Sequence, residues 1–244
     1  MKIVKAGYQI LNPDLDDPNI APKIYRLIEL AGRTCYKSED KITPESGEKF
    51  VRAMVRNGHE AMIEHAHMTV KFTVDRGVSH ELVRHRLCSF AQESQRYCAY
   101  NKDKFGGEVA FIEPGFFNYL TPQTRKQIRD ILDSGDLPDD FEASELMKRY
   151  ALWYGDCQIA ERGYLELLNL GCPPEEARAI LPNSTKTEIV VTADMREWRH
   201  IFKLRAAGLT GKPHPQMLEV MVPLLNECRA NLPALFEDIL PMEE

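Results

Sequence analysis

Residues 84–97, RHRLCSFAQESQRY, combine three arginines, a histidine, two serines and two glutamines within fourteen positions. Guanidinium groups suit phosphate because they can bind it bidentately, and hydroxyls and amides add further hydrogen bonds. The whole chain is nevertheless acidic, with net charge -6 and a sequence pI near 5.7. Residues 76–97 carry four arginines against two glutamates. This local excess fits a small anionic or flat ligand better than a nucleic acid, which would need a broad basic surface.

The segment leading into this cluster, residues 78–87, has the pattern of a helix. A helical wheel places Val78, Leu82 and His85 on one side and Val83 and Leu87 on the other. A helix that is apolar on two sides is expected between two layers, so its arginines should not be freely solvated. Two interpretations stay open. One is an ion pair of Glu81 with Arg84 or Arg86, and the other is a phosphate clamp.

Arg205 is the second unusual residue, because it falls within the apolar stripe of a helix predicted over residues 194–208. The stripe consists of Trp198, Ile201 and Phe202. The aliphatic part of Arg205 could extend along the surface near the helix end; otherwise its guanidinium meets a ligand or a carboxylate. Asp194 and Glu197 have the spacing of an N-cap and a capping box.

Histidines form a third group, since five of the seven lie between positions 59 and 85. His59 and His65 are six residues apart, whereas the zinc-binding helix H-E-x-x-H needs four. His65 and His67 share a strand face without an obvious third ligand, so we expect no metal. The sequence also lacks the glycine-rich nucleotide motifs and the G-x-S-x-G elbow. If a nucleotide binds, arginines must hold it.

These residues need a framework of strands and helices. We expect strands at 1–10, 65–74, 108–114 and 185–194, and helices at 21–34, 43–58, 78–87, 121–133, 141–171, 173–182, 194–208 and 213–232, the last kinked at Pro223. Residues 134–141 read as a linker, which does not divide the chain. This mixture predicts the α/β (α+β) class, with one compact domain over residues 1–244 and helices packed on a mixed sheet.

The amino-acid composition and the cysteines indicate the cellular compartment in which the protein is expected. Apolar residues make up 43% and charged residues 28% of the chain, as in ordinary globular proteins. No signal peptide and no membrane-spanning run is visible. The six cysteines form no C-x-x-C motif, which favours free thiols and a cytoplasmic location.

The order Arg84, His85, Arg86 and then Ser94 resembles the signature of the flavin-dependent thymidylate synthases. The segments GHEAMIEH, HELVRHR, EEARAILP and TADMREWRHIFKLR follow the family's order, and the resemblance covers roughly residues 20–235. It implies a homotetramer with FAD sites shared between subunits. It also implies conversion of dUMP to dTMP with methylenetetrahydrofolate and NADPH, reduced FAD supplying the hydride and no cysteine attacking the pyrimidine.

The resemblance assigns roles residue by residue. The FAD-binding positions are His59, Ala61, Arg84, His85, Arg86, Gln92, Asp194, Arg196 and His200. The dUMP-binding positions are Glu81, Leu82, Val83, Arg84, Gln92, Ser94, Gln95, Arg96, Arg178 and Arg205. Arg205 is also the expected catalytic residue, held against the uracil ring. Ala91, Gln92, Asp194 and His200 depart from residues frequent in the family.

Two other functions remain as alternatives. A nucleotide-binding protein could have kept the arginines and lost turnover, and a metal-dependent hydrolase could use the histidines. Partners in the favoured interpretation are small molecules and further copies of the chain, without nucleic acid or membrane.

Overall fold

The computed structural model describes residues 1–102, 106–135 and 143–242. The chain divides into two compact units. The first comprises Met1–Ala6, Thr73–Ser79 and Gln92–Thr187, and the second comprises Gly7–Phe72, His80–Ala91 and Glu188–Glu244. Most of the predicted linker at 134–141 lies outside the described residues. The interpretation of residues 1–244 as one domain stays a prediction.

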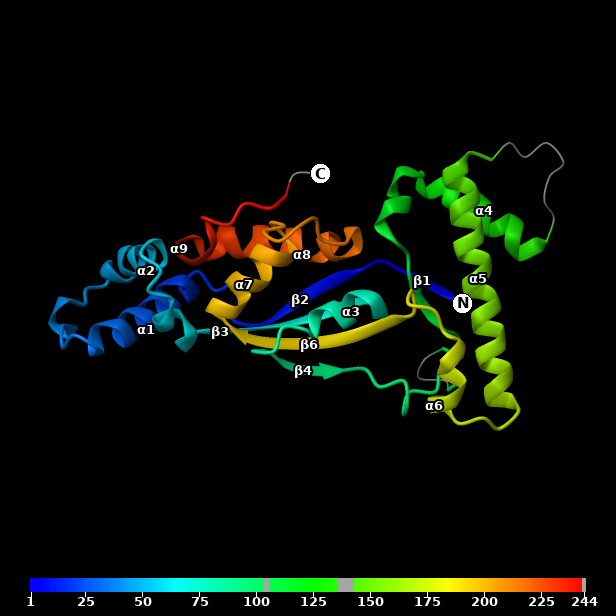
Figure 1. Ribbon diagram of the computed structural model, residues 1–244, viewed down its shortest axis with the longest axis horizontal. Coiled ribbons are helices and arrows are strands. Elements are labelled where there is room, and N and C mark those ends of the chain that lie inside the picture. Colours follow the sequence, from blue (N-terminus) through cyan, green and yellow to red (C-terminus); the bar gives the residue numbers. More distant parts are fainter. Residues whose placement is uncertain (103–105, 136–142, 243–244) are drawn as a thin grey trace. The chain divides into compact units, whose positions relative to one another are not determined.

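A four-stranded sheet, most of whose residues belong to the second unit, has the strand order β2-β3-β6-β4 (Figure 1). Its strands are β2 (Gly7–Asn12), β3 (His67–Asp75), β6 (Lys186–Asp194) and β4 (Ser89–Gln92). Thr69 and Thr192 share a hydroxyl hydrogen bond of 3.0 Å, and Lys71 pairs with Glu188 at 2.8 Å. Since one residue number rises as the other falls, β3 and β6 run antiparallel.

The predicted alternation of β3 is confirmed. Ala66, Met68, Val70, Phe72 and Val74 are all buried, whereas the intervening side chains are less so. On the buried side lies Trp198, whose indole N–H donates to the Met68 carbonyl over 2.9 Å. Trp198 belongs to α7 (Met195–Arg205), which covers the sheet together with α8 (Pro215–Asn231) (Figure 1). The helix that carries Arg205 is therefore anchored on the sheet by its apolar stripe.

The predicted helices of the second unit form within a few residues of their expected positions, as α1 (Ile20–Thr34), α2 (Ser46–Arg56), α7 (Met195–Arg205) and α8 (Pro215–Asn231). The short helix α9 (Pro233–Phe236) and the 3-10 turns η1 (Glu39–Lys41) and η2 (Glu60–His65) were not predicted. Pro223 lies inside α8, which continues past it, and the predicted kink there stays a prediction.

The first unit pairs β1 (Lys2–Val4) in parallel with β5 (Ala110–Ile112). Its helical elements are α4 (Pro122–Ser134), α5 (Glu145–Asn169), α6 (Pro174–Ala177), η4 (Gly115–Tyr119) and η5 (Arg178–Ile180). Thr121 caps α4 by accepting from the Thr124 backbone N–H. Gly171, with φ +87°, supplies the left-handed residue that follows α5, as its place in the sequence indicates. No helix in the described part of the chain is both long and apolar enough to cross a bilayer.

Three predicted elements are wrong. The helix expected over residues 173–182 is the four-residue α6 followed by the 3-10 turn η5. The strand expected over residues 1–10 is two strands, and β1 and β2 belong to different sheets. The helix expected over residues 78–87 is α3, which covers only Arg76–Leu82. Beyond it, the His85 N–H donates to the Leu82 carbonyl, three residues back, so the chain tightens into a turn. It then enters β4, which pairs with β6 and which the local pattern did not predict.

Candidate active site

The R-H-R motif forms the turn between α3 and β4. The side chains of Arg84 and Arg86 are exposed, and neither has an ion-pair partner among the described residues. Val83 and Leu87 are 41% and 75% exposed. The expected helix buried between two layers is therefore wrong, because the residues that would form its second apolar side point to solvent from a turn.

His85 lies between these two arginines and is the buried residue of the motif, with an exposed fraction of 6%. Its burial agrees with the wheel, which put it on the side of Val78 and Leu82. Arg205 donates from Nε to Nε2 of His85 over 3.2 Å. Burial, then the charges of Arg205 and His200, lower the pKa of His85 to about 4. The imidazole is therefore neutral at pH 7, and Nε2 acts as an acceptor.

Arg205 also forms an ion pair, from Nη1 to Oε2 of Glu81 over 2.7 Å. Of the alternatives for Arg205, the contact with a carboxylate is confirmed. The proposed pair of Glu81 with Arg84 or Arg86 is wrong, because Arg205 occupies that carboxylate. The side chains of Arg205 and Glu81 are 22% and 33% exposed, so the pair is reachable from solvent.

Asp194 is the N-cap of α7, as predicted, and its Oδ1 accepts from the Glu197 backbone N–H over 2.8 Å. The other half of a capping box is replaced by a different contact. The Glu197 carboxylate lies with Oε1 3.5 Å from Nδ1 of His85. Burial, followed by the charges of Glu197 and Asp194, raises the pKa of the nearby Cys88 thiol to about 12.

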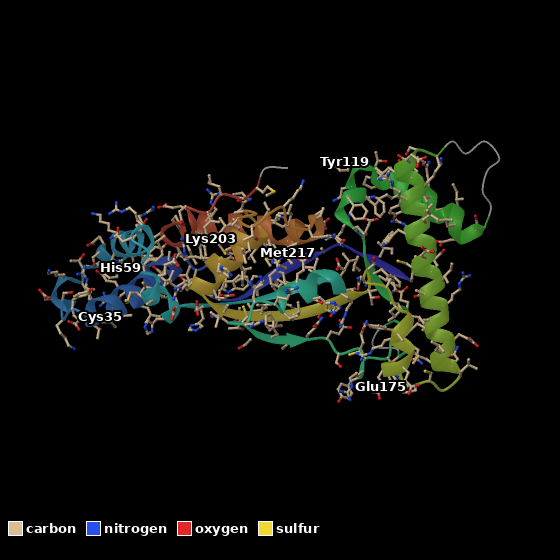
Figure 2. The ribbon with its side chains drawn as sticks, viewed as in Figure 1. Cys35, His59, Tyr119, Glu175, Lys203 and Met217 are labelled. Carbon is tan, nitrogen blue, oxygen red and sulfur yellow. The ribbon has the colours of Figure 1, made fainter. Side chains whose placement is uncertain are left out.

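The remaining predicted flavin positions are exposed: His59, Ala61, Arg196 and His200. His59 precedes η2 (Figure 2), and His200 lies on α7 with its ring centroid 6.0 Å from that of His85. Arg196 forms ion pairs with Glu60 and Glu64 of η2. The residues near the start of α7 and those of η2 are thereby held together.

Sequence reasoning missed Glu60 and Arg199. Arg199 is 1% exposed, with Nε 3.2 Å from Glu60 and both terminal nitrogens 2.7 Å from Asp238. Arg196, Arg199 and Lys203 follow the spacing i, i+3, i+7, which puts them on one helix face, and all three contact Glu60. The spacing of these three basic residues is the sequence pattern that could have indicated an acidic partner for this face of α7.

A second group of predicted residues lies in the first unit. Arg96 Nε is 3.9 Å from the Glu175 carboxylate, and Arg178 donates from Nε to the Glu175 backbone carbonyl over 3.2 Å. Glu175, on α6, is labelled in Figure 2. Two arginines that are far apart in the sequence thus meet at one residue. Ser94 Oγ accepts from the Arg96 N–H at 3.3 Å, and Gln95 is buried.

Gln92, which was predicted to contact FAD and dUMP, makes hydrogen bonds within the protein. Its side-chain amide donates to the Ser79 hydroxyl over 3.0 Å and to the Thr187 hydroxyl over 3.2 Å. Both amide hydrogens are therefore used within the protein. His65 and His67 are exposed, and the described part of the chain contains no group of three potential ligands able to hold a metal.

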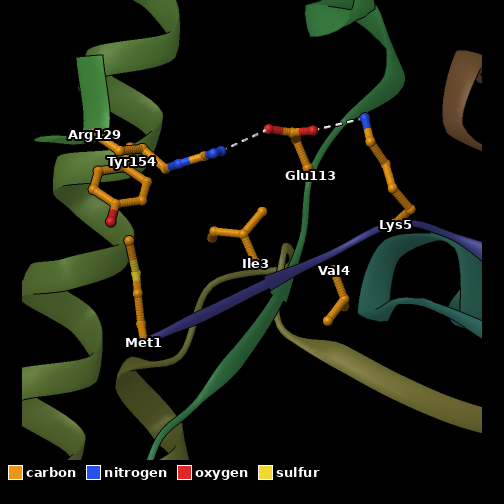
Figure 3. A pocket seen from close by; sticks show the side chains of 7 residues that line it. All are labelled: Met1, Ile3, Val4, Lys5, Glu113, Arg129 and Tyr154. Carbon is orange, nitrogen blue, oxygen red and sulfur yellow. Dashed lines mark hydrogen bonds and ion pairs between the residues drawn. The ribbon is translucent and has the colours of Figure 1, made fainter. Parts of the chain in front are cut away.

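A cavity of about 330 Å³ in the first unit contains none of the predicted site residues (Figure 3). It is lined by Met1, Ile3, Val4, Lys5, Glu113, Arg129 and Tyr154. The Glu113 carboxylate is saturated by Lys5 at 2.6 Å, Arg125 at 2.8 Å and Tyr150 at 2.9 Å. These contacts, together with the cation of Arg125, keep the pKa of Glu113 below its usual value despite burial. This cluster is an internal network of ion pairs and hydrogen bonds that joins the residues just after β1 and β5 to α4 and α5.

Comparisons with known proteins agree with the motif. Residues 20–234 match the family described as thymidylate synthase complementing protein. The flavin-dependent thymidylate synthase of Corynebacterium glutamicum is 33% identical over 87% of this chain and 78% of its own. The enzyme of the same name from Mycobacterium bovis is 30% identical over the same shares.

Solved structures extend the likeness to the fold. A UMP/dUMP methylase, PolB, from Streptomyces cacaoi, bound with 5-Br dUMP, has a TM-score of 0.66 and 21% identity, covering 97% of this chain and 96% of its own. The same protein bound with 5-Br UMP gives a TM-score of 0.67. On the family match and on the identity to its relatives, this chain belongs to the thymidylate synthase complementing protein family, the flavin-dependent thymidylate synthases.

Proposed function

We propose that this protein is a flavin-dependent thymidylate synthase that converts dUMP to dTMP. Methylenetetrahydrofolate is the carbon donor and NADPH reduces FAD. The observation that carries the proposal is the R-H-R turn. Two exposed guanidinium groups, of Arg84 and Arg86, flank a buried neutral His85 that contacts Arg205. The family membership of the chain supports the same reaction.

The residues around the turn fit FAD. Arg84 and Arg86 have no ion-pair partner among the described residues, and guanidinium groups suit a diphosphate. His59, Ala61, Arg196 and His200 offer further exposed contacts, Asp194 lies at the start of α7, and Gln92 and His85 complete the set. Bound reduced flavin would supply the hydride that turns the transferred methylene into a methyl group.

For dUMP, we assign the phosphate to Arg96 and Arg178, which Glu175 brings together. Ser94 and Gln95 would add hydrogen bonds, and the Ser94 hydroxyl hydrogen stays available because its oxygen accepts from the Arg96 N–H. Glu81, Leu82, Val83, Arg84 and Gln92 form the other contacts that the family resemblance implies.

Arg205 would act on the uracil. Its Nη1 and Nε have partners, whereas Nη2 has none among the described residues and is left for a ring carbonyl. A guanidinium beside the ring favours deprotonation of N3, since it stabilises the anion directly. The ring then has more electron density at C5, the carbon that must attack the methylene donor. Arg205 is therefore the proposed catalytic residue.

No cysteine is needed in this reaction. Cys88, the cysteine nearest the R-H-R turn in sequence, has a pKa raised to about 12, so its reactive thiolate is disfavoured at neutral pH. All six cysteines are free, in keeping with the cytoplasmic location that we propose.

We further propose a homotetramer in which different subunits complete each site. Val83, Leu87 and Tyr97 are exposed apolar or aromatic side chains close to the motif in sequence, and a partner subunit would cover them. The single domain over residues 1–244 is the unit of this assembly.

The visible spectrum of purified protein and its anaerobic turnover test the proposal. We expect a yellow protein that forms dTMP from dUMP when methylenetetrahydrofolate and NADPH are added. A colourless protein with stoichiometric zinc would instead support a hydrolase. A colourless, metal-free protein that binds dUMP without turnover would support a nucleotide-binding protein.

A further inference from the structure

We propose that Glu197 is a positioning residue, which holds the His85 ring in one tautomer and orientation so that His85 in turn holds Arg205. The effect on His85 concerns the protein alone. Its consequence for dUMP rests on the proposed function. Glu197 has no role in the flavin and dUMP contacts described above.

The tautomer follows from hydrogen-bond counting. A neutral imidazole has one N–H and one acceptor nitrogen. Arg205 donates its Nε–H to Nε2 of His85 over 3.2 Å, so Nε2 is the acceptor. The hydrogen must then be on Nδ1, and Nδ1 faces Oε1 of Glu197 at 3.5 Å. This distance exceeds an ordinary hydrogen bond of about 2.7–3.2 Å, so the contact is an oriented electrostatic one.

Glu197 occupies a costly position for a carboxyl group. It is 7% exposed, and burial raises its pKa, with His200 opposing the shift and Asp194 adding to it. Asp194 already satisfies its backbone N–H, so the Glu197 side chain is not needed to cap α7. Among the described residues, His85 Nδ1 is the basic nitrogen that lies within ion-pair distance of this carboxyl group. The contact with His85 therefore accounts for a carboxyl group being buried at this position.

The resulting series of contacts runs from Glu197 to His85, then to Arg205, then to Glu81. Two neighbours fix the guanidinium plane of Arg205, from Nε and from Nη1. Residues that lock the rotamer of a catalytic side chain lower the cost of ordering it when substrate binds. If the His85 ring loses its Nδ1 partner, its alternative tautomer presents an N–H to the Arg205 N–H, and the contact between them breaks.

Nitrogen NMR of histidine-labelled protein reads the tautomer without flavin or substrate. In the unmodified protein we expect Nδ1 of His85 to be protonated and Nε2 to be unprotonated at pH 7. Glu197→Leu, of similar size but without an acceptor, should shift the two signals toward a tautomer mixture. Glu197→Gln keeps an acceptor oxygen and should preserve the pattern. Glu48→Leu, on α2, serves as the matched control, because its carboxylate pairs with Arg52 instead.

Titration with dUMP measures how the same Glu197 variants bind the proposed substrate. We expect affinity to fall by about 10-fold in Glu197→Leu and to stay within about 3-fold in Glu197→Gln, since one lost restraint corresponds to roughly 1–1.5 kcal/mol. A merely structural role would make both variants unstable and leave the tautomer unchanged.

The inference would be overturned if His85 of the unmodified protein carried its hydrogen on Nε2, a result that does not depend on any variant folding. A Glu197→Leu protein with the unmodified tautomer would overturn it equally. If the tautomers behave as expected but the unmodified protein binds no dUMP, the proposed function fails while the positioning of His85 is supported.

Discussion

Arg205 and Glu81 meet as an ion pair with Nη1 2.7 Å from Oε2, and the pair is partly open to solvent. Arg205 lies in the apolar stripe of its helix, and its charge is paired while the side chain stays partly accessible to solvent. Its partner, Glu81, is one of the residues that the family resemblance assigns to dUMP. The substrate would therefore meet a guanidinium that is already oriented and still has one terminal nitrogen to offer.

Replacing Arg205 should separate binding from stability. Arg205→Ala should change the free energy of unfolding by less than about 1 kcal/mol, because the pair with Glu81 is partly exposed. Affinity for dUMP should fall at least about 10-fold, since charge-assisted hydrogen bonds contribute roughly 1.5–3 kcal/mol. Arg205→Lys should be intermediate, because it keeps the charge and loses the planar fork. Calorimetric titration and chemical denaturation measure the two effects.

The control for this prediction is Arg52→Ala, which breaks exposed ion pairs with Glu48 on α2 and with Glu237. It should leave dUMP affinity unchanged. Normal dUMP turnover by Arg205→Ala would show that the ion pair with Glu81 is its whole role.

Acid should weaken the fold through His85. Its pKa is about 4 in the folded protein and 6.5 in the unfolded chain, so the unfolded chain binds the proton first as the pH falls. The contribution is fully present above pH 6.5 and is lost progressively toward pH 4, by up to about 3 kcal/mol. His85→Gln can still accept from Arg205 but does not titrate. Denaturation at several pH values should show a shallower loss for His85→Gln; parallel curves would refute the assignment.

Two arginines on α7 offer a matched pair. Arg199→Ala removes a fully buried side chain together with its ion pair to Asp238 and its bond to the Leu235 carbonyl, so it should destabilise the protein by about 3 kcal/mol or more. Arg196→Ala removes an exposed side chain and should cost less than about 1 kcal/mol, while lowering flavin retention. Thermal unfolding and the flavin-to-protein absorbance ratio distinguish them. Equal destabilisation by both changes would contradict the different burial of the two residues.

The proposed sharing of active sites between subunits predicts complementation between inactive variants. Ser94→Ala and Arg205→Ala should each lose dTMP formation, because they affect different groups of the proposed site. Mixed under conditions that allow subunit exchange, they should recover a fraction of the activity, since some sites would receive Ser94 from one chain and Arg205 from another. An active monomer in sedimentation, or no recovery despite proven exchange, would exclude sites of this kind.

How much the sequence could predict depends on the range of each interaction. The alternation of β3 and the apolar stripe of α7 are local patterns imposed by one sheet face, and both were predicted correctly. The end of α3 was not, because the periodicity of residues 78–87 continues through the turn. Pairing of β4 with β6, a contact distant in sequence, decides that segment instead.

The site follows the same rule. Local spacing identified Asp194 as an N-cap and put His85 on the buried side of its segment. It misassigned Glu81, whose true partner Arg205 lies on another element. Likewise, the meeting of Arg96 and Arg178 at Glu175 has no local signature, and only the family resemblance indicated that both belong to one site.

The most direct test of the whole account is a single anaerobic turnover of protein whose flavin has been reduced beforehand, with dUMP and methylenetetrahydrofolate added and NADPH left out. The measurement is the amount of dTMP formed against the amount of flavin oxidised. We predict one dTMP for each flavin oxidised, and none with Arg205→Ala. Formation of dTMP without flavin oxidation, or flavin oxidation without dTMP, would contradict the account.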